Sequence, residues 1–147
     1  MRPILIFVAA AMLLFSCSHE HKTGEAGHHD GHAAHTELAL NNGERWQADE
    51  ATNDNIAQLQ QLMEEHLSQP DADEPEAVYE LGRNMQLGFQ EVFDECRMKG
   101  PEHDMLHVYL MPMLEDVKAL ESSRVEDALA ARDRLAEQLE AYQIYFK

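Results

Sequence analysis

Apolar side chains recur three or four positions apart from Trp46 to the end of the chain, the spacing of one helix face. Boundary residues divide this pattern. Asp49 is a good N-cap, Pro75 and Pro101 suit first helical positions, and Gly100 suits a helix end. The pattern therefore predicts four helices, over about residues 49–68, 75–100, 101–120 and 124–146.

Short connections join the predicted helices, so neighbouring helices are expected to run antiparallel. Four helices of about 20 residues then form an up-down-up-down bundle roughly 30 Å long. No stretch alternates convincingly between apolar and polar residues, as a half-buried strand would. The expected fold class is all-α, and a chain of 147 residues supports one such domain, which we place at 46–147.

The start of the chain has a different pattern, with an apolar run over residues 4–15. This run is typical of a secretory signal peptide and is too short for a bilayer span, which takes about 20 residues. It ends in Leu14-Phe15-Ser16-Cys17, which resembles the lipobox of bacterial lipoproteins. The resemblance implies a signal peptide at 1–16 and acyl chains of the palmitate type on Cys17. The alternative is an ordinary cleaved leader with an unmodified cysteine.

Lipidation would hold the mature chain at a membrane while its domain stays in water. The resemblance to enteric lipoproteins implies that an Asp after the lipidated cysteine favours the inner membrane, and Ser18 stands there instead. We therefore expect an outer-membrane location, facing either the periplasm or the exterior. Cys96 is then left without an intrachain disulfide partner, so it is a buried thiol, an intermolecular bridge or a ligand.

Residues 17–45 contain few large apolar side chains and are expected to form a disordered tether. Neutral imidazole is a good ligand for zinc, copper and nickel, and a flexible chain can wrap several imidazoles around one ion. The tether therefore predicts weak and unselective metal capture, although a solvated spacer would have the same composition. Its six histidines are His19, His21, His28, His29, His32 and His35.

The main candidate metal site lies where the second predicted helix gives way to the third. Cys96 continues the apolar stripe of the second helix, and His103 and His107 are one helical turn apart. Met98, which lies between Cys96 and His103 in the sequence, offers a thioether ligand. We expect the histidine stripe to face the bundle interior because it continues into Leu110, Leu114 and Val117. The expected ligand set is Cys96, Met98, His103 and His107.

Sulfur and imidazole ligands together favour copper over hard cations such as magnesium, and Cys with His also suits zinc. Haem b is a further alternative, although adjacent ligands at one corner suit a small ion better than a macrocycle. The aromatic residues that could line a haem pocket are Trp46, Phe93, Tyr142 and Tyr145. A buried Cys and locally hydrogen-bonded histidines with no metal role would explain the same sequence.

Other residues of these types are expected to be structural. His66 should lie at the opposite end of the bundle, either exposed or structural. Met85, Met111 and Met113 are expected to be core residues, because methionine in a helix usually fills gaps in the core. Met111 and Met113 are about 200° apart around a helix, so at most one of them could face an ion.

The net charge and the motifs of the chain exclude two classes of function. With 28 acidic and 11 basic residues, the net charge of −17 argues against binding to nucleic acid. The stretch from His103 to His107 differs from the zincin motif because Asp104 replaces the catalytic Glu, and no nucleophile–base pair is visible, so we expect no enzyme.

The expected function is that of a lipid-anchored extracytoplasmic metal-binding protein, with copper favoured over zinc. Its role would be metal sequestration, metal transfer or metal resistance. The candidate partner is a metal-transfer protein. The Cys-x-Met…His-x-x-x-His stretch at 96–107 and the lipobox resemble small envelope lipoproteins of heavy-metal handling systems. The alternatives are an interaction lipoprotein that presents an acidic bundle to an envelope partner, and a haem-binding electron-transfer bundle.

Overall fold

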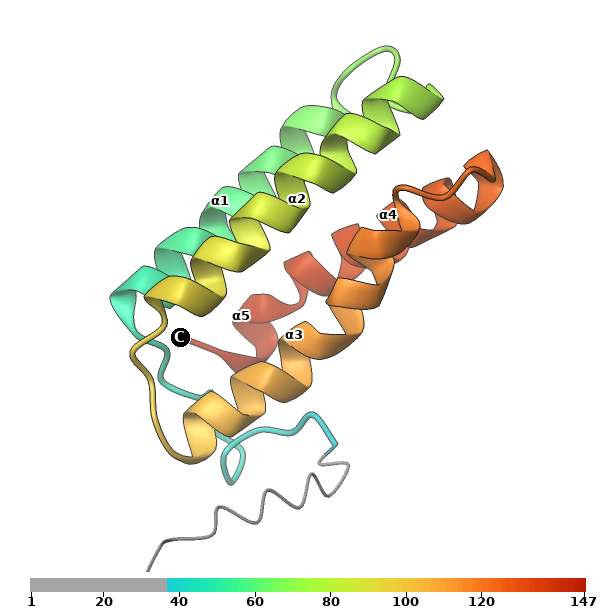
Figure 1. Ribbon diagram of the computed structural model, residues 1–147. Coiled ribbons are helices and arrows are strands. Elements are labelled where there is room, and N and C mark those ends of the chain that lie inside the picture. Colours follow the sequence, from blue (N-terminus) through green and yellow to red (C-terminus); the bar gives the residue numbers. More distant parts are fainter. Residues whose placement is uncertain (1–36) are drawn as a thin grey trace, which may run out of the picture. The chain divides into compact units, whose positions relative to one another are not determined.

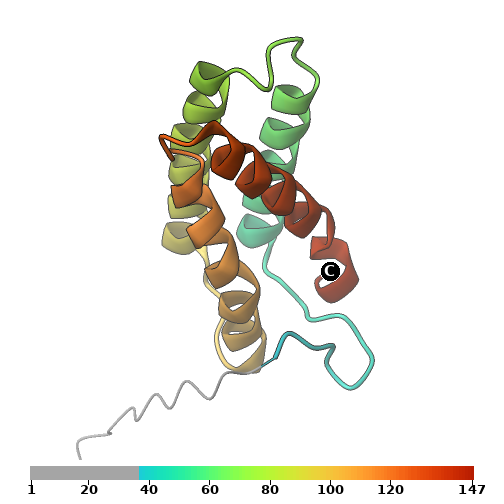
Figure 2. The same ribbon diagram turned by 90° about the vertical axis from the view of Figure 1, so that its right-hand side faces the viewer.

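A computed structural model describes residues 37–147, so the predicted leader, Cys17 and the six tether histidines lie outside the described residues. The described chain forms α1 (Glu50–Leu67), α2 (Pro75–Glu95), α3 (Pro101–Ala119), α4 (Val125–Glu140) and the short α5 (Tyr142–Tyr145). The chain reverses direction at each connection between the four long helices (Figures 1 and 2). The predicted all-α bundle is confirmed, and no strand occurs over 37–147. None of the helices in this range is long and apolar enough to cross a membrane.

The long helices begin where local sequence signals predicted. Asp49 caps α1, because its Oδ1 accepts a hydrogen bond from the Thr52 backbone N–H at 2.8 Å. Pro75 and Pro101 open α2 and α3 at positions where a backbone N–H has no helical partner. These starts depend on residues within one turn, and the sequence therefore located them correctly.

Two helix ends differ from the prediction. α2 ends at Glu95 rather than near Gly100, and its C-cap Cys96 already has an extended backbone. The N–H of Arg97 donates to Asp49 Oδ2 at 2.7 Å, which draws the segment after α2 toward the start of α1. The fourth predicted helix is interrupted at Ala141, between α4 and α5, and the chain is extended from Phe146.

Apolar faces of the four long helices meet in one core. α1 and α2 approach closely, since a Cβ added to Gly88 would lie 2.6 Å from Leu59 Cδ2. The largest side chains in the core are almost completely buried, and they include Ile56, Leu59, Met85, Phe89, Leu106, Leu110, Met113, Leu135, Leu139 and Phe146.

The segment before α1 is tied to the C-terminus. Trp46 N–H donates to the Tyr145 carbonyl at 2.7 Å, and Lys147 N–H donates to the Trp46 carbonyl at 2.9 Å. Upstream, a tight turn joins Asn41 and Glu44 through two backbone hydrogen bonds. Regular hydrogen bonding thus begins ahead of Trp46, where the sequence pattern placed the start of the bundle.

His66 lies near the C-terminus of α1, at the far end of the bundle from the start of α3. Its residue exposure is only 5%, and its Nε2 has no hydrogen-bond partner. Burial and the positive charge of Arg132 lower the pKa of this imidazole. Arg132 is itself buried and pairs with Asp73 and Asp133. His66 is therefore a structural residue, one of the two placements expected for it.

Candidate functional site

Two histidines of α3 form the closest pair of metal-ligating side chains that we find in the described chain. His103 and His107 are one turn apart near the helix start, and their Nε2 atoms are 3.2 Å apart. The two rings meet edge to face, with centroids 4.5 Å apart and planes at 68°. At this separation the two nitrogens form one hydrogen bond, in which one ring donates its N–H and the other ring accepts.

The surroundings of His107 favour neutral imidazole. His107 packs near the ring of Phe93 on α2, with centroids 5.8 Å apart. Burial lowers the pKa of His107, the neighbouring His103 lowers it further, and Asp104 partly opposes both effects. A lowered pKa favours the neutral form of His107 at neutral pH, in which one ring nitrogen is unprotonated and can bind a metal.

The spacing of the two nitrogens also suits a single ion. Nitrogen ligands lie about 2.0–2.1 Å from zinc, so two of them in tetrahedral geometry would be roughly 3.3 Å apart. The observed separation of 3.2 Å is close to this value. The separation of the two Nε2 atoms is therefore compatible with one ion bound by both.

The orientation of the pair corrects one expectation. The histidine stripe was expected to face the bundle interior, but His103 keeps 36% of its side chain exposed and His107 is only half-buried. Leu110 and Val117 of the predicted stripe are buried, but the buried face of α3 is centred to one side of the two histidines. Its members are Met105, Leu106, Tyr109, Leu110, Met113 and Val117. The pair thus lies at the edge of the core, within reach of solvent.

The two predicted sulfur ligands lie on the segment that connects α2 to α3. Cys96 and Met98 are both half-buried there. Over residues 37–147, no three His, Cys, Asp or Glu residues are grouped so as to hold a metal ion. The structure therefore brings His103 and His107 together but does not gather Cys96 with them.

The three methionines expected in the core are not all placed there. Met85 and Met113 are fully buried and fill the core as expected. Met111 is 53% exposed, so the expectation of a core residue was wrong at this position. Of two methionines on nearly opposite sides of α3, only Met113 belongs to the face that packs against the other helices.

Three of the four aromatic residues considered for a haem pocket lie around the C-terminal segment, because Trp46 pairs with it through the backbone. Tyr142 stacks on Phe146 with centroids 5.1 Å apart, and Tyr109 packs against both rings. Trp46 donates its indole N–H to the Ala39 carbonyl at 2.6 Å. Phe93 alone among the four contacts the ring of His107.

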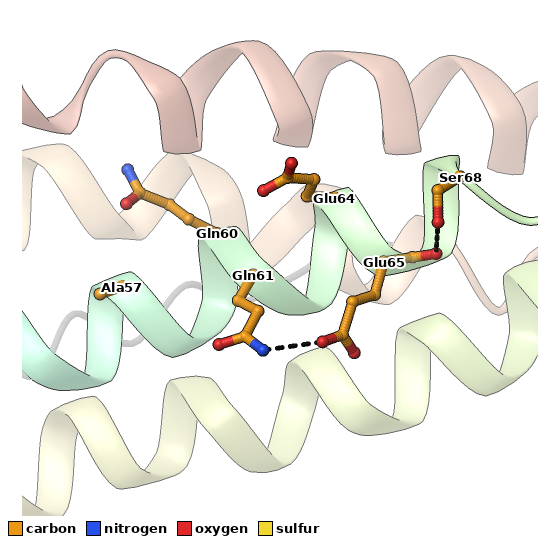
Figure 3. Close-up of a pocket in the computed structure, with 6 residues that line it drawn as sticks. All are labelled: Ala57, Gln60, Gln61, Glu64, Glu65 and Ser68. Carbon is orange, nitrogen blue, oxygen red and sulfur yellow. Dashed lines mark hydrogen bonds between the residues drawn. The ribbon is translucent and has the colours of Figure 1, made fainter.

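A hollow beside α1 is lined by residues of that helix and its C-cap, namely Ala57, Gln60, Gln61, Glu64, Glu65 and Ser68 (Figure 3). Gln61 Nε2 donates to Glu65 Oε1 at 2.7 Å, and Ser68 Oγ donates to the Glu65 carbonyl at 2.7 Å (Figure 3). These hydrogen bonds are made between neighbouring residues along a solvated helix surface. The hollow presents neither an imidazole nor a sulfur ligand, and it is therefore a weaker candidate than the histidine pair.

Comparisons with known proteins give this chain no family assignment. No protein-family model matches it, and no curated protein or solved structure shows significant similarity to it.

Proposed function

We propose that the protein binds a transition-metal ion through His103 and His107, with copper favoured over zinc. The observation that carries the proposal is the 3.2 Å separation of the two Nε2 atoms on a half-exposed helix face. Two imidazoles leave coordination positions open on the ion. A site of this kind serves sequestration or transfer, in which the ion must also leave, and the role is binding rather than catalysis.

The sequence supports an extracytoplasmic setting for this function. The lipobox at residues 14–17 favours lipid attachment to Cys17 and a location at the outer membrane. The tether histidines would collect ions loosely and raise their concentration near the bundle, and the acidic surface would add long-range attraction for cations. A metal-transfer protein would be the partner that receives the ion.

Metal titration of the full mature chain tests the proposal. The double variant His103→Gln/His107→Gln should lose the tightest site for Zn²⁺ and Cu⁺ in competition with a chromophoric chelator. The matched control is His28→Gln/His29→Gln, which removes the same number of imidazoles from the tether and should keep that site. Circular dichroism checks that both variants remain helical. Equal affinities for the two variants would contradict the proposal.

The anchoring part of the proposal has its own test. Replacement of Cys17 by Ala should move the expressed protein from the membrane fraction to the soluble extracytoplasmic fraction. Replacement of Cys96 by Ala serves as the control and should leave the protein in the membrane fraction. Retention of the Cys17 variant in the membrane would contradict lipid anchoring without affecting the metal site.

A further inference from the structure

Asp104 lies beside the second ring nitrogen of His103. The distance from His103 Nδ1 to Asp104 Oδ1 is 3.9 Å, while the Nε2 of the same ring is 3.2 Å from His107 Nε2. One nitrogen of this imidazole thus meets the other imidazole, and the remaining nitrogen has a carboxylate close to it. A histidine that binds a metal ion through one nitrogen usually donates the N–H of the other nitrogen to a carboxylate, carbonyl or water, which holds the ring in place.

A small rotation of the Asp104 side chain would complete such a hydrogen bond. The distance of 3.9 Å is about 1 Å longer than a hydrogen bond between nitrogen and oxygen. The side chain of Asp104 is 83% exposed, and over residues 37–147 it forms no other ion pair that would hold the carboxylate elsewhere. The terminal torsion of aspartate is broad, so the carboxylate can turn toward Nδ1 while the helix stays fixed.

The carboxylate bears on the tautomer of His103, that is, on which of its two nitrogens carries the hydrogen. A neutral imidazole has one N–H, and the bond between the two Nε2 atoms joins a ring that donates to a ring that accepts. An ionised carboxylate only accepts, so Asp104 favours the hydrogen on Nδ1 of His103. The Nε2 of His103 is then the acceptor, with a free lone pair, and His107 is the donor.

We propose that Asp104 is a positioning residue, whose carboxylate accepts the Nδ1–H of His103 and keeps the Nε2 of that ring free to bind the ion. The inference rests on the function proposed above and names the residue that prepares one of its two ligands. A metal ion needs the lone pair of each nitrogen that it binds. His103 holds this lone pair ready before the ion arrives, and His107 alone has to release its Nε2 proton to water and take one at Nδ1.

Simple attraction between a carboxylate and a cation is the competing explanation for an effect of Asp104. Glu102 separates the two explanations, because it is the other acidic residue in the first turn of α3. Glu102 precedes His103 and Asp104 follows it, so each lies about 100° from His103 around the helix axis. Attraction at a distance would act from both residues and would weaken in salt, whereas a hydrogen bond to Nδ1 would come from Asp104 alone.

Nitrogen NMR of the full mature chain, ¹⁵N-labelled and free of metal, tests the inference first. The ring nitrogen shifts report the tautomer of each histidine, and they are recorded at about pH 8, where imidazole is mostly neutral. His103 should carry its hydrogen on Nδ1 in the parent protein and in Glu102→Gln. Asp104→Asn should lose this preference, because an amide can donate as well as accept. Asp104 is exposed, so this variant should keep its fold.

The affinity for Zn²⁺, measured in competition with a chromophoric chelator, gives a second readout. Asp104→Asn should weaken the tightest site by about tenfold or more, and added salt should not remove the difference from the parent protein. Glu102→Gln is the matched control and should change the affinity much less. The tether is identical in both variants, so its binding cancels in the comparison.

Other outcomes overturn the inference in ways that can be told apart from failure of the proposed function. Equal losses of affinity in the two variants, or an unchanged His103 tautomer in Asp104→Asn, contradict a hydrogen bond from His103 to Asp104. A zinc complex in which Asp104 binds the ion directly would contradict the positioning role. If His103→Gln/His107→Gln keeps the parent affinity, the metal site itself is wrong, and the tautomer measurement, made without metal, still decides whether Asp104 holds the His103 ring.

Discussion

The carboxylate of Asp49 caps α1 and also accepts the backbone N–H of Arg97, 48 positions further along the chain. The two hydrogen bonds use different oxygens and join the start of α1 to the segment after α2. Burial acts to raise the pKa of Asp49, but the hydrogen bonds from Thr52 and Arg97 outweigh it, and the net pKa is lowered. The ionised carboxylate is therefore the form that stabilises the fold.

Replacement of Asp49 by Ala should lower the free energy of unfolding by about 1–2 kcal/mol, because it removes an N-cap and leaves the Arg97 N–H without its partner. Urea denaturation followed by circular dichroism measures the effect. Asp54→Ala, an exposed position on the same helix, should change stability by less than about 0.5 kcal/mol. Equal effects at the two positions would show that the cap has no special role.

Acid should destabilise the protein through His66 and His107. Both have a folded-state pKa below the ordinary histidine value of 6.5, so the unfolded chain binds more protons than the folded chain near and below that pH. The free energy of unfolding should consequently fall as pH is lowered through about 6.5, and change less at higher pH.

His66→Asn removes one of these titrations and should flatten the slope of unfolding free energy against pH between about pH 5 and 7. The readout is the slope, because the substitution also changes packing and the absolute stability. A slope identical to that of the parent protein would mean that His66 titrates as it does in the unfolded chain.

The contrast between two methionines tests how differently the fold buries them. Met85→Ala should cost about 2–5 kcal/mol of stability, because the side chain is fully buried. Met111→Ala should cost less than about 0.5 kcal/mol, since the side chain is largely in solvent. A large cost at Met111 would indicate that its side chain packs into the core.

The C-terminal aromatic cluster should be as important for stability as the long helices. Phe146 is fully buried against Tyr109 and Tyr142, so Phe146→Ala should cost about 3–5 kcal/mol in chemical denaturation. Ile144→Ala is a nearby control at an exposed position. If both variants unfold at the same denaturant concentration, the tail does not contribute to the core.

The parts of the fold that depend on neighbouring residues were predictable from the sequence. Asp49, Pro75 and Pro101 mark helix starts through local geometry, and the structure confirms all three. The end of α2 was missed because a contact with Asp49 determines it, and no spacing near Glu95 reveals that contact. The pairing of Trp46 with the C-terminal segment was missed for the same reason.

The candidate site was predictable in part. The spacing of His103 and His107 correctly places them on one helix face, but the sequence did not establish which face of α3 is buried. Apolar residues cover more than half of this helix, so its core face depends on how the other helices pack.

The most direct test is a crystal structure of the protein with Zn²⁺, recorded with X-rays at the zinc absorption edge. The account predicts an anomalous peak about 2 Å from the Nε2 atoms of both His103 and His107. Peaks confined to other residues, with these two nitrogens still in contact and without metal, would contradict it.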